Sequence, residues 1–124
     1  MPLYNTATAA AALDASHKWL DNILSHNDIE GVQSDTQGVS RRLSLSSIIL
    51  LSLAKQLGVS LEINSAAALR IATRISASQS GDISISPRLR VLVDLDGIRA
   101  DILADLERAV EIAPTPRRGR PPKR

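Results

Sequence analysis

The sequence predicts a mainly α-helical fold with small β elements. Apolar residues recur at the spacing of one helix face along most of the chain, whereas alternation of apolar and polar residues is confined to short stretches. The chain has one Trp, one Tyr and no Phe, so its core must be built from Leu, Ile, Val and Ala. Its 124 residues suffice for one domain with an appended element or tail.

Two short helices joined by a tight turn are expected at the start of the chain. Thr6 can cap a helix that continues to about Ala12, and residues 13–15 predict a tight connection. Ser16 then caps a second helix that continues to about His26. The apolar residues of this second helix share one face at helical spacing: Trp19, Leu20, Ile23 and Leu24.

A short hairpin is expected over residues 30–43. Its strands lie near residues 31–33 and 39–42, on either side of a turn-rich centre of polar residues and Gly. The hairpin therefore separates the two short helices from the longer ones that follow.

Two longer helices come after the hairpin. Ser44 or Ser46 caps the first, which is apolar nearly all round, so we expect it to be the central buried helix. This helix is expected to continue to Leu57, with Gly58 as its stop. The second, rich in Ala and Leu, is expected over residues 61–75.

The apolar period changes from helical to two after residue 81. Two strands turning near residues 86–88 are expected, with Asp96 and Gly97 ending the second strand, and then a helix over residues 98–112. Residues 82–113 are too few to bury a core of their own, so they must either pack on the body or pair with another chain. Our hypothesis is a homodimer formed here. The candidate dimer contacts are Leu89, Val91, Val93, Leu95, Ile102 and Leu106.

The order of helix, tight turn, helix, hairpin and two long helices is the arrangement of a winged helix-turn-helix, which we assign to residues 1–76. The polar face of its second helix would enter the major groove of DNA, with the hairpin as the wing. A solvated helix face is the competing explanation, and Trp19 is expected in the core. The candidate contacts are Ser16, His17, Lys18, Asp21, Asn22 and Ser25 on the helix, and Gln37, Ser40, Arg41 and Arg42 on the wing.

Three segments, residues 8–20, 38–44 and 57–62, carry a resemblance to a known family, the MerR-like DNA-binding domains. The first segment is similar to that family's first two helices, the second to the end of its wing, and the third to the link before its fourth helix. The resemblance spans about residues 4–75 and implies binding of double-stranded DNA, often as a dimer, through the second helix and the wing. The chain departs from the family in lacking the usual aromatic pair of the recognition helix, the long coiled-coil dimer helix and any cysteine sensor site.

The last eleven residues, 114–124, form a basic tail in which five residues are Arg or Lys and none is acidic. Without them, ten basic residues stand against thirteen acidic ones, so the body carries −3 and the tail +5. Residues 118–121 read Arg-Gly-Arg-Pro between basic flanks, and this run resembles the AT-hook motif. The resemblance implies an extended, disordered ribbon in the minor groove of A·T-rich DNA. A localisation signal or a solubilising end is the alternative. The candidate contacts are Arg117, Arg118, Gly119, Arg120, Pro121, Lys123 and Arg124.

These features favour a sequence-preferring protein that binds double-stranded DNA, and a transcriptional regulator is the first hypothesis. An architectural, recombination-directing or partition protein is the alternative within the same class, and it would coat DNA beyond one palindrome. A protein-interaction adaptor or antitoxin-like partner is the alternative from another class, and a stoichiometric protein partner would favour it. The sequence leaves any small-molecule effector open.

No enzymatic site is expected. Asp94, Asp96 and Asp101 could form a carboxylate cluster, but we expect them to end a strand and to favour the N-terminus of the last helix. The absence of Cys excludes a thiolate metal site, and no metal or cofactor is expected. With no recognisable signal peptide and no apolar run of membrane length, we expect a cytoplasmic, nucleoid-associated protein.

Overall fold

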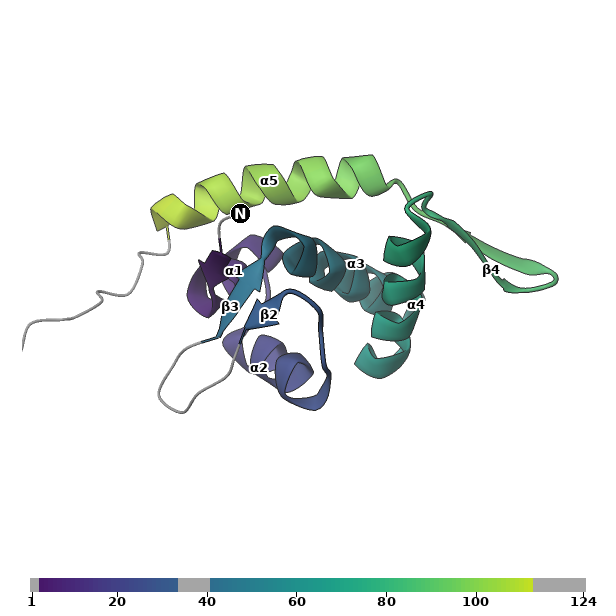
Figure 1. Ribbon diagram of the computed structural model, residues 1–124, viewed down its shortest axis with the longest axis horizontal. Helices are drawn as coiled ribbons and strands as arrows, with labels where there is room; N and C mark the ends of the chain where they lie inside the picture. Colours follow the sequence, from purple (N-terminus) through teal and green to yellow (C-terminus); the bar gives the residue numbers. More distant parts are fainter. Residues whose placement is uncertain (1–2, 34–40, 113–124) are drawn as a thin grey trace, which may run out of the picture.

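The computed structural model describes residues 3–33 and 41–112. Within these residues the chain is mainly helical, with two small antiparallel sheets (Figure 1), which confirms the expected fold class at that level. In chain order the elements are β1 (Leu3–Asn5), α1 (Thr6–Leu13), α2 (His17–His26), β2 (Val32–Gln33), β3 (Arg42–Ser44), α3 (Leu45–Leu61), α4 (Ser65–Ser78), β4 (Asp82–Ser86), β5 (Leu89–Leu92) and α5 (Leu95–Ile112).

The first sheet has three strands in the order β1-β3-β2. Strand β1 was not predicted, because three residues are too few for an alternating pattern and their partner, β3, lies about 40 residues along the chain. This strand leads directly into α1, whose cap is Asn5 and not Thr6: the Asn5 side chain accepts the Thr8 N–H at 2.8 Å. The second strand of the expected hairpin lies slightly later than predicted, at Arg42–Ser44.

The tight connection between α1 and α2 is confirmed. Asp14 adopts the left-handed conformation (φ 54°, ψ 45°), which ends α1, and α2 begins three residues later. Its N–H donates to the Ala11 carbonyl at 3.1 Å, and the Ala15 N–H donates to the Ala10 carbonyl at 3.0 Å. Ser16 then caps α2, as predicted, by accepting the Trp19 N–H at 3.0 Å.

Helix α3 begins at the expected cap, Ser44, but the prediction that Gly58 ends it is wrong. The helix continues to Leu61 and is closed by Glu62 in the left-handed conformation (φ 55°). Gly58 instead lies where the chain after α3 turns back: a Cβ there would meet the Ile63 carbonyl oxygen at 3.4 Å and the Ala68 Cβ at 3.7 Å. Because α3 is longer than expected, α4 starts later than predicted, at Ser65, and also ends later, at Ser78.

The junction between β5 and α5 also differs from the prediction. The alternating pattern extends to Leu95, but β5 ends at Leu92 and Leu95 is already helical. Asp94 explains the difference, because its Oδ1 accepts the Gly97 N–H at 3.0 Å in the manner of a helix cap. The helix therefore begins three residues before the predicted start, and Gly97 lies in its first turn and not after a strand.

Helix α5 lies across α1 and α3 and completes the core they share (Figure 1). Four of its residues are buried in this way, namely Ile98, Ile102, Leu106 and Ala109. Ile102 and Leu106 are only 2% and 3% exposed, so their assignment to a dimer contact is corrected: they face the chain's own core. Residues 82–113 were expected either to pack on the body or to pair with another chain, and α5 packs on the body. No helix in residues 3–33 and 41–112 is both long and apolar enough to cross a membrane.

Candidate nucleic-acid interface

Helix α2 has the two faces that its sequence predicts. Leu20, Ile23 and Leu24 are buried, and Trp19 packs half-buried against the same core. The left-handed turn at Asp14 and the cap at Ser16 fix where α2 begins. Because the apolar face of α2 is buried in the core, its polar face points to solvent. The predicted contact residues on α2 are all exposed: Ser16, His17, Lys18, Asp21, Asn22 and Ser25.

Arg41, which precedes β3, reaches across to α2. Its Nη2 donates to the Ser25 Oγ at 3.1 Å, and its Nη1 lies 3.5 Å from the Asp21 Oδ1. The Arg41 side chain is 28% exposed, so it is not closed off from solvent. The structure therefore brings together one predicted wing residue and two predicted helix residues, a contact between positions 16 and 20 residues apart that no local sequence signal reports.

The base of the predicted wing is anchored to the start of α3. Gly31 has φ +93°, and its carbonyl accepts the Ser44 N–H at 2.9 Å. A Cβ at Gly31 would collide with the Ser44 Oγ, and the positive φ would strain any other residue, so this position favours glycine. Ser44 in turn caps α3 through the Ser47 N–H. The sequence interpretation did not single out Gly31, although an isolated Gly beside a strand is the usual signal of such an approach.

The remaining wing and tail candidates fall into two groups. Arg42 lies in β3 and is exposed, next to the fully buried Leu43. Gln37 and Ser40 lie outside the described residues. The tail candidates also lie outside them: Arg117, Arg118, Gly119, Arg120, Pro121, Lys123 and Arg124.

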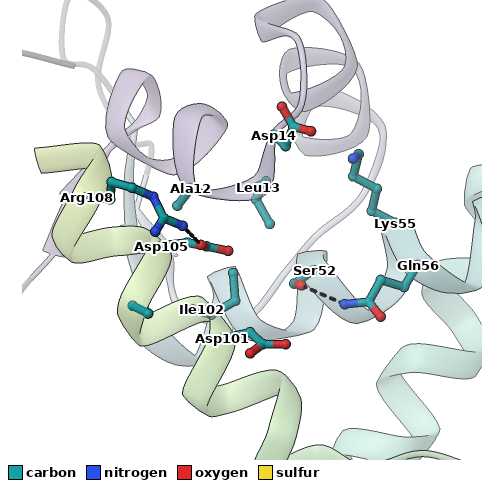
Figure 2. A pocket seen from close by; sticks show the side chains of 11 residues that line it. Ala12, Leu13, Asp14, Ser52, Lys55, Gln56, Asp101, Ile102, Asp105 and Arg108 are labelled. Carbon is teal, nitrogen blue, oxygen red and sulfur yellow. Dashed lines mark hydrogen bonds and ion pairs between the residues drawn. The ribbon is translucent and has the colours of Figure 1, made fainter. Parts of the chain in front are cut away.

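A polar cleft of about 490 Å³ lies on another part of the body, between the end of α1, α3 and α5 (Figure 2). Asp105 pairs with Arg108 at one side, and the Gln56 Nε2 lies 3.4 Å from the Ser52 Oγ at the other. Asp101, expected at the helix terminus, instead lines this cleft. Its sides carry both signs of charge, so the cleft is not a basic surface of the kind that attracts a phosphate backbone.

The acidic residues of α5 do not gather into a metal site in the part of the chain described. No group of three or more His, Cys, Asp or Glu side chains there is arranged to hold a metal ion. Asp94 and Asp96 lie at the start of α5, as expected, where carboxylates interact favourably with the helix dipole.

No protein-family model matches the chain, and no curated protein matches it. The resemblance of residues 4–75 to the MerR-like domains therefore remains a prediction from the sequence pattern.

Proposed function

We propose that the chain is a sequence-preferring DNA-binding protein, a transcriptional regulator, that binds double-stranded DNA as a winged helix-turn-helix. Helix α2 would lie in the major groove, with the segment between β2 and β3 as the wing. The observation that supports this most is the position of Arg41, whose guanidinium lies beside Ser25 and Asp21 on the exposed face of α2. A wing cation and the recognition helix would then meet the same stretch of duplex.

The exposed chemistry of α2 suits base and phosphate contacts. Asn22 carries the amide that pairs with the edge of adenine, and Lys18 can contact a phosphate. Asp21 alone would repel the backbone, but the neighbouring Arg41 offsets its charge. An Asp at such a position can also accept a hydrogen bond from the amino group of cytosine. The face therefore has the means to prefer one sequence over another.

The basic tail would supply the electrostatic part of the affinity. The body carries −3 and the tail +5, so non-specific attraction to the duplex is expected to come mainly from residues 114–124. Its resemblance to an AT-hook supports insertion into an A·T-rich minor groove beside the site that α2 occupies. Such a protein would be found with the nucleoid.

Binding to A·T-rich and G·C-rich duplexes over a salt series tests both parts, using fluorescence anisotropy with the full chain and a form ending at Ala113. We expect the shortened form to bind more weakly, with no A·T preference and a log–log salt slope that falls by up to about 4.5 units, since five cations are removed and each phosphate contact contributes about 0.9. A shortened form that binds neither duplex, nor any member of a random-sequence pool, would contradict the role of α2. A footprint that extends over long DNA would favour an architectural protein instead of a regulator.

A further inference from the structure

The β4–β5 hairpin extends beyond α4, away from the rest of the molecule (Figure 1), and leaves apolar side chains in solvent. Leu89 is 57% exposed and Leu92 is 79% exposed. The β4 side of the hairpin is held to the body, because the Arg74 Nη2 donates to the Ser84 carbonyl at 2.9 Å and Ile83 is buried. Among the described strands, none pairs with the outer edge of β5. A two-stranded hairpin is only marginally stable by itself, so this edge invites a further strand.

The backbone groups that face the free edge can be identified from the hairpin ladder. The Val93 N–H donates to the Gly81 carbonyl at 2.6 Å, and the register continues as Asp82 opposite Leu92 and Ile83 opposite Val91. Hydrogen-bonded and non-hydrogen-bonded pairs alternate in an antiparallel ladder. The backbone groups of Val91 therefore point toward β4, whereas those of Arg90 and Leu92 point outward.

A second copy can pair with this edge as an antiparallel strand, and a two-fold register can be centred on any of the four residues of β5. Centred on Leu89, the register would place Arg88 opposite the partner's Arg90, and centred on Arg90 it would place the two Arg90 guanidinium groups opposite each other, so both are unfavourable. Centred on Leu92, the register would run past the end of the strand toward α5, which begins at Leu95. Centred on Val91, the register keeps its hydrogen-bonded pair, Arg90 opposite the partner's Leu92, within β5 and stops short of α5. We propose that the chain forms a homodimer in this register centred on Val91, with the two hairpins joined in one four-stranded sheet.

The side chains at this register are complementary. The tip residue Leu89 comes opposite the partner's Val93, at an apolar groove of about 540 Å³ between α3, β5 and the start of α5. Arg88, beside the tip, comes opposite the partner's Asp94. Each hairpin thus carries an apolar and a basic residue at its tip, and an apolar groove and a carboxylate at its root. The apolar residues lining the groove are Leu53, Leu57, Leu61, Val91, Leu92, Val93 and Ile98.

This match of tip to root indicates that the occupant is a second copy of the chain and not an unrelated protein. An isologous contact needs the same patch to complement itself, and antiparallel pairing brings each tip to the other root. The dimer uses Leu89, Val91 and Val93 of the predicted contacts, and it adds Leu92 and the groove. It does not depend on the proposed DNA binding, because it is tested without DNA. It would nevertheless place two copies of α2 on one duplex and raise their joint affinity.

Sedimentation of the full chain without DNA, over a range of concentrations, tests the proposal. We expect a monomer–dimer equilibrium that Leu89→Glu shifts to monomer by at least about tenfold in Kd, because two carboxylates would enter the apolar grooves. Leu103→Glu is the matched control, since Leu103 lies on α5 and is similarly exposed at 45%. A wild-type chain that stays monomeric throughout, or a dimer that Leu103→Glu breaks and Leu89→Glu does not, would overturn it.

The register has a test of its own because the chain has no Cys. In the proposed dimer Val91 faces its symmetry mate as a non-hydrogen-bonded pair, with Cα atoms about 4.5 Å apart, within the range that a disulfide spans. Mild oxidation of Val91→Cys should therefore give a covalent dimer, whereas Leu89→Cys, which faces the partner's Val93, should stay uncrosslinked. Efficient crosslinking through Leu89→Cys but not through Val91→Cys would rule this register out.

Discussion

Asp14 holds a conformation that most side chains avoid, and the entry into α2 depends on it. At φ 54° an L-residue is strained by about 1–2 kcal/mol, less for Asp, whereas Gly is not. We therefore expect Asp14→Gly to be more stable than Asp14→Ala by roughly 1 kcal/mol in urea denaturation. The same pair of substitutions at Asp28, which is exposed and does not have a positive φ, is the control and should show no gain for Gly. If Asp14→Ala were the more stable variant, the turn would not have the geometry described.

Substitution of Arg41 should affect DNA binding much more than folding stability. Its contacts with Ser25 and Asp21 are largely exposed, so Arg41→Gln should change the free energy of unfolding by less than about 1 kcal/mol. The same substitution should weaken DNA binding by about tenfold on all sequences, and reduce the salt slope by about 1, as for a lost phosphate contact.

The matched control for Arg41 is Arg99→Gln, an exposed arginine on α5. Helix α5 lies on the other side of the body from α2 (Figure 1), so this variant should bind DNA as the wild type does. Equal losses in the two variants would mean that only net charge matters and that the Arg41 contact has no specific part in binding.

At the scale of the element, the effect of Gly58→Ala on stability shows whether Gly58 ends α3 or lies within it. A stop with a left-handed residue would be destabilised by Ala, but Gly58 lies inside α3 without a positive φ. An added Cβ would make ordinary contacts at 3.4 Å and 3.7 Å. We expect Gly58→Ala to raise the free energy of unfolding by about 0.5–1 kcal/mol, measured by circular dichroism in urea. Gly58→Leu, which would crowd Ile63 and Ala68, should lower it.

How well the sequence predicted each element depended on how local its determinants were. The caps at Ser16 and Ser44 were predictable, because each side chain binds backbone only three residues away. The end of α3 was not predictable, because Gly58 is a strong local stop signal. The helix instead continues to Leu61, and Gly58 lies where α4 packs against it. The contact of Arg41 with α2 was equally inaccessible, because 16 to 20 residues and a turn separate the partners. The sequence showed the apolar stripe of α5 that includes Ile102. The stripe alone does not show whether it packs on the chain's own core or on a partner.

At the scale of the whole molecule, α5 belongs to the core and is not a separate appendage. Its buried residues pack with α1 and α3. A chain shortened to end near Ser80, to remove the proposed dimer contact, would therefore expose that core, and loss of the dimer could not be told from loss of folding. Point variants of the full chain are therefore the appropriate test of the dimer.

A substitution in α5 should accordingly destabilise α2 as well, although α2 lies on the far side of the body in Figure 1. Leu106 is 3% exposed, so Leu106→Ala should cost roughly 2–5 kcal/mol. Trp19, the single Trp of the chain, reports on α2 by its fluorescence. If the helices unfold as one cooperative unit, the Trp19 transition in urea should shift together with the circular dichroism transition. Leu103→Ala, at a residue that is 45% exposed, should shift both by much less. A Trp19 transition that Leu106→Ala left in place would instead show that α5 and the N-terminal helices unfold independently.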